Sequence, residues 1–250
     1  MGTSVSISGG NAKVTIYGDG TVLGGNGNDT IKITGNGKVH LGNGNEKITI
    51  DGNGSITAGN GTDTIYLAGN GKINLGTGSD TINLGAGFDR IHDAGTATVI
   101  GAFGHATISG GDLSIHESKG IFDVTSKDGS ATLLGGSAES QFTGGSGKTV
   151  MIGGTGSDTF IGGSGFDTMT GGKGANLFEF LSKNAGGTDV ITNFVHGQDK
   201  LYLEGYNLKT LPTSDSVTYS GGVTTIKLDG GATTITVNGK ITGSDITTHK

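Results

Sequence analysis

The chain has 250 residues, of which 53 are glycine, one is proline and none is cysteine, and its net charge is −6. Without cysteine, disulfides, thiol catalysis and cysteine-based zinc sites are excluded, and the negative charge disfavours nucleic acids and anionic membranes as partners. Apolar residues make up only 32%, too few for a thick globular core, and no stretch approaches the roughly 18 apolar residues of a membrane span. A thin, repetitive fold is expected.

Residues 1–93 are dominated by a repeat of 17 residues. GNGNDTIKI, GNGNEKITI, GNGTDTIYL and GTGSDTINL each hold one acidic residue, and GNGKVHL, GNGSITA and GNGKINL run between them with asparagine instead. Alternating apolar residues after each glycine turn predict two short strands per turn of a solenoid. The acidic turns then stack along one edge and the asparagine turns along the other, where asparagine serves turn geometry without an ion.

Both ends of this repeat depart from the pattern. Ala12 stands in the acidic position of the first turn, and GAGFD places Asp89 on the edge that otherwise carries asparagine. Residues 94–134 keep the regular apolar spacing but lose the acidic position, as in ATISGGDLSI. Because this stretch lacks proline and alternates in polarity, it is interpreted as degenerate solenoid turns rather than a linker.

Residues 135–180 contain four nonapeptides without a gap: GGSGKTVMI, GGTGSDTFI, GGSGFDTMT and GGKGANLFE. They follow G-G-x-G-x-D-x-U-x, with U apolar, and so resemble the calcium-binding repeat of the RTX (repeats in toxin) family. The resemblance implies an all-β, right-handed parallel β-roll in which each nonapeptide is half a turn. The upstream GxGxDxU turns share this pattern.

The resemblance also implies Ca²⁺ as the cofactor. Calcium takes six to eight oxygen ligands, so one carboxylate and the carbonyls of one glycine turn cannot complete a shell. The resemblance implies that each site is shared by two turns stacked on the same edge. Thr149 and Asn176 occupy the ligand position without a charge, and Glu46 is longer than the family's aspartate. The predicted ligands are the acids Asp29, Glu46, Asp63, Asp80, Asp89, Asp158, Asp167 and Asp189, with turn glycines Gly25, Gly27, Gly42, Gly44, Gly59, Gly61, Gly76, Gly78, Gly153, Gly156, Gly162, Gly165, Gly171 and Gly174.

Residues 181–250 differ from the repeats. GGTDVITNFVHGQDKLYLE resembles the segment that closes RTX rolls, which makes Asp189 a ligand of the last site and Phe178, Phe180, Phe194 and Leu203 the core of a cap. The tail alternates around Asp229-Gly230-Gly231, a hairpin signal. It also resembles the uncleaved C-terminal signal of type I secretion substrates. Such a signal would explain why the N-terminus lacks the basic and apolar regions of a cleaved signal peptide.

No catalytic motif is present in the sequence. HExxH and GxSxG do not occur, and the six histidines are scattered without metal-ligand spacing. SGKT at 146–149 imitates the end of a phosphate-binding loop, but Phe142 stands where the first glycine is required. The chain is therefore expected not to be an enzyme.

Two functions remain for a secreted protein of this kind. The first is a calcium-dependent structural protein of a cell surface or extracellular matrix, as a surface-layer, matrix or filament subunit that folds on calcium after export. The alternative is a stand-alone RTX adhesion module that binds a cell-surface polysaccharide or another surface. Self-association end to end is expected because Ser4-Val5-Ser6-Ile7 alternates like one more strand before the repeats.

Overall fold

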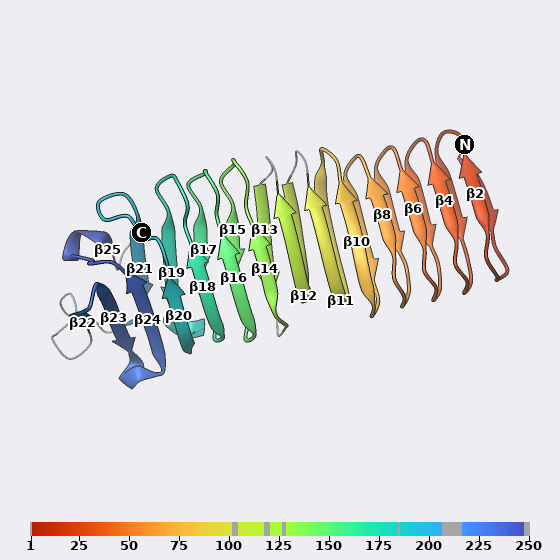
Figure 1. Cartoon of the computed structure of the whole chain (residues 1–250). Coiled ribbons are helices and arrows are strands. Elements are labelled where there is room, and N and C mark those ends of the chain that lie inside the picture. The colour runs from red at the N-terminus through yellow and green to blue at the C-terminus, as the bar shows by residue number, and fades with distance from the viewer. Residues whose placement is uncertain are drawn as a thin grey trace. The chain divides into compact units, whose positions relative to one another are not determined.

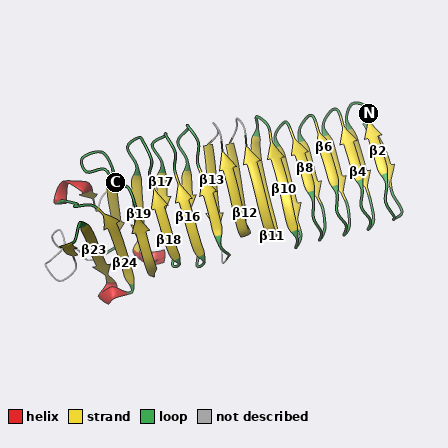
Figure 2. Cartoon of the chain, viewed as in Figure 1, coloured by secondary structure: helices red, strands yellow, loops and turns green. Residues whose placement is uncertain are grey.

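The computed structural model describes residues 2–101, 105–117, 121–126, 129–184, 186–206 and 217–247, which form a parallel β-solenoid. The predicted all-β fold is confirmed. The chain divides into two compact units, Met1–Ile121 and Phe122–Lys250. Figure 1 shows strands stacked in chain order within each unit, and Figure 2 shows the short loops that join them. Parts of the expected degenerate turns (102–104, 118–120 and 127–128) and of the tail (248–250) lie outside the described residues.

Each turn of the N-terminal unit adds one strand to each of two sheets. One sheet contains β1 (Thr3–Ser6), β3 (Gly20–Leu23), β5 (Gly37–His40), β7 (Gly54–Thr57) and β9 (Gly71–Leu75). The other contains β2 (Lys13–Ile16), β4 (Thr30–Ile33), β6 (Lys47–Ile50), β8 (Thr64–Leu67) and β10 (Ser79–Leu84). The long strands β11 (Phe88–Gly101) and β12 (His105–Glu117) continue both sheets.

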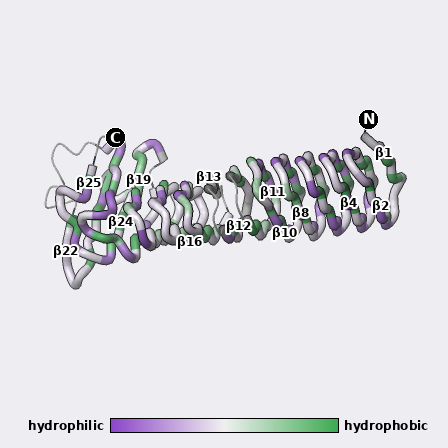
Figure 3. Tube along the Cα trace, turned by 90° about the horizontal axis from the view of Figure 1, so that it is seen from above, coloured by the Kyte–Doolittle hydropathy of each residue, from purple (hydrophilic) through white to green (hydrophobic). Residues whose placement is uncertain are grey.

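The core of this unit is one side chain deep. Ile31, Ile48, Ile65 and Ile82 stack in register in one sheet, all at most 1% exposed. Because strand side chains alternate between faces, the residues between them point outward. Figure 3 shows this alternation of hydrophobic and hydrophilic residues along the turns. Stacked isoleucines thus replace the thick core that the composition excludes.

The C-terminal unit has the same construction, with turns of 18 residues up to β19 and longer turns after it. One sheet contains β13 (Ile121–Ser126), β15 (Gln141–Thr143), β17 (Thr159–Ile161), β19 (Leu177–Leu181), β21 (Lys200–Glu204) and β25 (Ile246–Thr247). The other contains β14 (Ala131–Leu134), β16 (Lys148–Ile152), β18 (Phe166–Thr170), β20 (Gly187–Ile191), β24 (Thr233–Asn238), β23 (Val223–Leu228) and β22 (Val217–Ser220). Among the residues described in this unit, three short 3₁₀ segments, η1 (Ser182–Asn184), η2 (Asp229–Gly231) and η3 (Gly243–Asp245), lie between strands.

Aromatic side chains fill the core of this unit. Phe142, Phe160 and Phe178 stack in register, with ring centroids 5.6 and 4.9 Å apart, and Phe194 lies 5.9 Å from Phe178. The predicted tail hairpin is present, since β23 pairs antiparallel with β24 across the turn at Asp229–Gly231. One sheet therefore ends in the antiparallel strands β24, β23 and β22, whereas the other ends with β25, which pairs parallel with β21.

Candidate metal centre

The acidic residues of the upstream turns form one buried column. Asp29, Glu46 and Asp63 directly precede β4, β6 and β8, and Asp80 is the second residue of β10, so in-register pairing stacks all four. Their exposed fractions are only 0 to 3%. The turns thus direct their carboxylates into the solenoid instead of toward water. The structure brings these four predicted ligands together as the sequence predicted.

Hydrogen bonds connect this column from turn to turn. Oδ1 of Asp29 accepts the N–H of Ala12 at 2.8 Å, Oδ1 of Asp63 accepts that of Glu46 at 2.9 Å, and Oδ1 of Asp80 accepts that of Asp63 at 2.7 Å. Oδ2 of each aspartate is buried without a hydrogen-bond partner. Both carboxylate oxygens of Glu46 are also buried and also lack a partner. Each carboxylate therefore has a free buried acceptor, which is costly unless a cation or donor meets it.

The electrostatics of the column show this cost. Burial raises the pKa of Glu46 to about 9, helped by the adjacent carboxyl of Asp63 and the charges of Asp29 and Asp80. Burial likewise raises the pKa of Asp80 to about 6, and the charges of Asp93 and Asp63 add to the increase. Like charges stacked at strand spacing repel one another in a region of low dielectric.

The glycines of these turns permit close stacking. At Gly61, a Cβ would overlap the carbonyl oxygen of Gly44 in the preceding turn. At Gly153, a Cβ would overlap Oδ2 of Asp158, so the glycine leaves room for the carboxylate under the turn. A positive φ is found at Gly154 (109°) but not at Gly153 or Gly156. Close approach of the carboxylate explains the glycine at Gly153.

Two polar columns lie inside the C-terminal unit. In one, Oδ1 of Asp158 accepts the N–H of Ser140 at 2.8 Å, and Oδ1 of Asn176 accepts that of Asp158 at 3.0 Å. In the other, Oδ1 of Asp167 accepts the N–H of Thr149 at 3.1 Å, and Oδ1 of Asp189 accepts that of Asp167 at 3.0 Å. These bonds place the uncharged Asn176 and Thr149 in the same columns as the acids. The buried columns consist of Ser140, Asp158, Asn176 and Asp199, and of Thr149, Asp167 and Asp189.

Some members of these columns have a free oxygen and others do not. Oδ2 of Asp158 and Oδ2 of Asp189 are buried without a partner. Burial, with the charge of Asp167, raises the pKa of Asp189 to about 8. Asp199, absent from the predicted ligands, differs because its two oxygens accept the N–H groups of Asn176 (2.9 Å) and Val195 (2.8 Å). Asp199 therefore closes its column through hydrogen bonds.

Two further acids are buried in the turn that follows the upstream column. Asp89, predicted on the asparagine edge, pairs in register with Gly71 and is buried, with Oδ1 lacking a partner; burial raises its pKa to about 6. Asp93 was not predicted as a ligand, yet it is 0% exposed and its Oδ2 lacks a partner. The sequence signal for Asp93 is weak: it is an acid in an inward strand position, two residues before Gly95.

The asparagine turns form a separate, exposed ladder. Asn53 N–H donates to Oδ1 of Asn36, Asn70 N–H donates to Oδ1 of Asn53, both at 2.9 Å, and Phe88 N–H donates to Oδ1 of Asn70 at 2.8 Å. Asp19 begins this ladder by accepting the N–H of Asn36 at 2.7 Å. These side chains satisfy the backbone of the next turn, so the ladder explains the asparagine turns without an ion.

The columns fit calcium only if backbone oxygens contribute. Within the described ranges, no three histidine, aspartate or glutamate side chains lie close enough together to hold a metal ion. The buried unpartnered carboxylate oxygens beneath glycine turns are hard, charged acceptors, and calcium prefers such oxygens together with backbone carbonyls. The donor set is therefore suited to calcium and unsuited to zinc, for which histidine and cysteine are the usual ligands.

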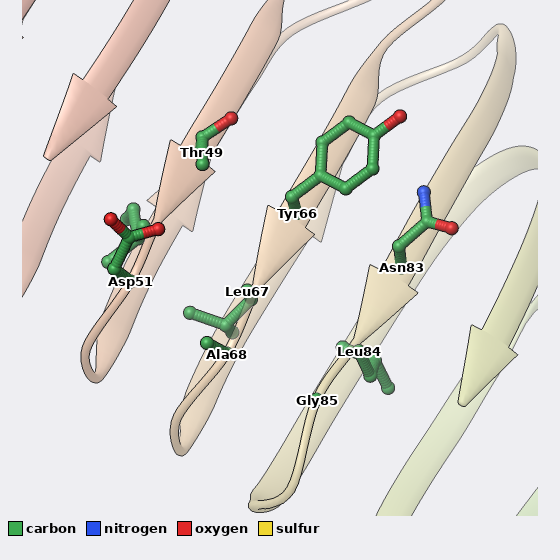
Figure 4. Close-up of a pocket in the computed structure, with 9 residues that line it drawn as sticks. Thr49, Asp51, Tyr66, Leu67, Ala68, Asn83, Leu84 and Gly85 are labelled. Carbon is green, nitrogen blue, oxygen red and sulfur yellow. The ribbon is translucent and has the colours of Figure 1, made fainter. Parts of the chain in front are cut away.

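A shallow groove of about 220 Å³ lies on the outer face of β6, β8 and β10. Figure 4 shows the Tyr66 ring between Thr49 and Asn83, with Asp51 at the adjacent turn. Tyr66 is 42% exposed, so part of its side chain is accessible to a ligand. The groove combines an aromatic surface with hydroxyl, amide and carboxylate groups.

Comparisons with known proteins add little. No protein-family model matches the chain, and no curated protein matches it. Among solved structures, the extracellular lipase LipA from Serratia marcescens is similar, with 18% identity and a TM-score of 0.31, covering 75% of this chain and 40% of the lipase. The chain thus spans less than half of that lipase. At this similarity the match carries no argument about activity, and the expectation that the chain is not an enzyme stays a prediction. No helix in the described residues is long and apolar enough to cross a membrane.

Proposed function

We propose that the chain is a secreted, calcium-dependent structural protein of a cell surface or extracellular matrix. The observation that carries the proposal is the column of buried carboxylates in which Asp29, Asp63 and Asp80 each have one unpartnered oxygen and Glu46 has two. A column of like charges destabilises the compact state unless cations neutralise it. The RTX resemblance of the repeats agrees with this interpretation.

Calcium, when bound, would supply the positive charge between stacked turns. Oδ2 of Asp29, Asp63 and Asp80 would face it, while Oδ1 holds the neighbouring turn through a backbone N–H. The glycines keep the turns close enough for carbonyls and carboxylates to share a site. Ion binding would then be coupled to folding, because the turns of an unfolded chain are not stacked. At low cytosolic calcium the chain would stay unfolded until export.

Circular dichroism of the chain with millimolar calcium and with excess chelator tests the proposal. We expect a β-rich spectrum that is lost when the ion is removed and returns when calcium is restored. Magnesium serves as the control, because its small octahedral shell suits shared carboxylates and carbonyls poorly. A β-rich spectrum of equal thermal midpoint in chelator would contradict calcium-dependent folding.

Self-association end to end is part of the same proposal. Within the described residues, β1 pairs only with β3 and β2 only with β4, so each has one unpaired edge. Unpaired edges offer N–H and C=O groups to a second copy, and a head-to-tail contact gives an open filament unless it closes a ring. Sedimentation over a range of concentrations in calcium, with and without residues 2–8, tests this; an unchanged monomer in both would contradict it.

The groove at Tyr66 favours a second candidate function, an adhesion module for polysaccharide. An exposed tyrosine ring flanked by Thr49 and Asn83 matches the chemistry of a pyranose ring, which has apolar C–H faces and hydroxyl edges. Binding to a panel of insoluble polysaccharides tests it, with Tyr66→Ala against Tyr17→Ala, a tyrosine exposed outside the groove. Loss of polysaccharide binding in the Tyr66→Ala variant alone would favour the adhesion function. Equal binding by both variants would show that the groove is not the binding site.

A further inference from the structure

The upstream acid column lacks its regular next member. The turn after Asp80 places Ala97 directly beside it, in the register in which every earlier turn stacks its acid. Ala97 is 0% exposed and has no side-chain oxygen. A site shared by the turn of Asp80 and the turn above it is therefore missing a carboxylate from the usual position.

Asp93 lies at the same edge of the solenoid, in the coil that stacks on the loop between β9 and β10. It pairs in register with Leu75, the last residue of β9, and the register of β11 shifts between Asp93 and Thr96. There the chain crosses between the sheets directly over the turn below, because Thr96 N–H donates to the carbonyl of Gly78 at 2.9 Å. Asp93 therefore stacks on Leu75 at the start of the turn that leads to Asp80, and the charge of Asp93 acts on Asp80.

The side chain of Asp93 points into the solenoid. It replaces an apolar residue of the inward column, is 0% exposed, and its Oδ1 accepts the N–H of Gly95 at 2.8 Å. Its Oδ2 is buried without a partner, as is Oδ2 of Asp80. The groups whose charges act on Asp93 are Asp63, another member of the column, and the exposed His92. Two carboxylate oxygens, Oδ2 of Asp80 and Oδ2 of Asp93, are therefore buried without a partner at one end of the column.

We propose that Asp93 supplies the second carboxylate of a terminal calcium site whose first carboxylate is Asp80. Asp93 would thereby replace, from the crossing between sheets, the ligand that Ala97 cannot provide. This inference rests on the proposed calcium binding of the repeats. The competing explanation is that Asp93 only fixes the turn through its bond to Gly95.

An Asp93→Asn variant separates these explanations, because the amide keeps an oxygen for the Gly95 N–H and removes only the charge. Asp19→Asn is the matched control: it makes the same charge change at an exposed position, and asparagine occupies that position in the following turns. Calcium binding to the chelator-treated full chain is measured by titration calorimetry. We expect the Asp93→Asn variant to bind one ion fewer than the original chain and the control to bind the same number.

A rescue variant completes the test. The double variant Asp93→Asn, Ala97→Asp restores a carboxylate in the regular position and should regain the lost ion. If Asp93→Asn fails to fold in calcium, recovery of the β-rich spectrum and ion count in the double variant supports the site, and lack of recovery contradicts it. An unchanged ion count and affinity in folded Asp93→Asn would overturn the inference while leaving calcium binding intact. No calcium binding by the original chain would instead overturn the proposed function.

Discussion

Oδ1 of Asp63 accepts the backbone N–H of Glu46 at 2.9 Å, while Oδ2 of the same carboxylate is buried without a partner. One side chain thus joins two adjacent turns and presents a free acceptor to the interior. The same division of roles recurs at Asp29 and Asp80. It provides a way to alter charge and hydrogen bonding independently.

Asp63→Asn should lower the number of bound calcium ions while preserving the bond to Glu46, because an amide oxygen replaces Oδ1. The comparison is Asn53→Ala on the exposed edge, which removes the acceptor of the Asn70 N–H. That variant should lose about 0.5 to 1.5 kcal/mol of unfolding free energy and keep its ions. Calorimetric titration and denaturant unfolding measure both quantities; equal ion loss in the two variants would show that the edges are assigned wrongly.

The metal-free solenoid should become less stable as the pH rises. Burial raises the pKa of Asp80, Asp89 and Asp158 to about 6, of Asp189 to about 8 and of Glu46 to about 9. A carboxyl whose pKa is higher in the folded than in the unfolded state contributes stability below the unfolded value of about 4, which is lost as the pH rises through the folded value.

In chelator, the β-rich fold should therefore be most stable near pH 4 and be lost as the pH rises toward about 9, the window set by these pKa values. Calcium should reverse the trend, because it binds the charged carboxylates. Thermal unfolding followed by circular dichroism at several pH values, with and without calcium, checks the prediction. A metal-free midpoint that rises across this window would show that the carboxylates are stabilised by something other than protons.

Alanine at Gly59 should destabilise the fold more than alanine at the equivalent Gly25. A Cβ on Gly59 would overlap the carbonyl oxygen of Gly42, whereas a Cβ on Gly25 meets its nearest atom, the Cα of Gly9, at 3.4 Å. Overpacking of this kind costs about 1 to 3 kcal/mol. Urea unfolding in saturating calcium compares the two variants. The same loss of unfolding free energy at both positions would mean that the stacked turns move apart enough to accommodate the added Cβ of Gly59→Ala.

Asp245→Ala should loosen the C-terminal segment. The buried Asp245 accepts the N–H groups of Gly197 (3.1 Å) and Thr242 (2.8 Å) and lies 2.6 Å from Nδ1 of His196. Although burial opposes ionisation, these hydrogen bonds lower the pKa of Asp245 to about 2. Hydrogen exchange should accelerate in residues 195–200 and 242–247. His196→Ala should have a smaller effect, because that side chain is 57% exposed. An equal effect would show that the contact between His196 and Asp245, and not the backbone hydrogen bonds to Asp245, stabilises the segment.

The sequence by itself determined the solenoid and its acid columns. Strict 17-residue spacing forces Asp29, Glu46, Asp63 and Asp80 into register, because in parallel stacking equal turn lengths place equal positions side by side. The hairpin around Gly230 was also predictable, since its turn residues and alternation are local signals.

Only the tertiary structure decided what happens where the period breaks. Asp93 is buried above Leu75, just before β11 crosses between the sheets with a register shift, a change that no local pattern encodes. The closure of a column by Asp199 likewise depends on the path of residues 192–200, since Val195 and Asn176 occupy both of its oxygens. Where the repeat is regular, equal spacing determines which residues of adjacent turns lie side by side. At an irregular turn, these contacts depend on how the chain packs against the preceding turn.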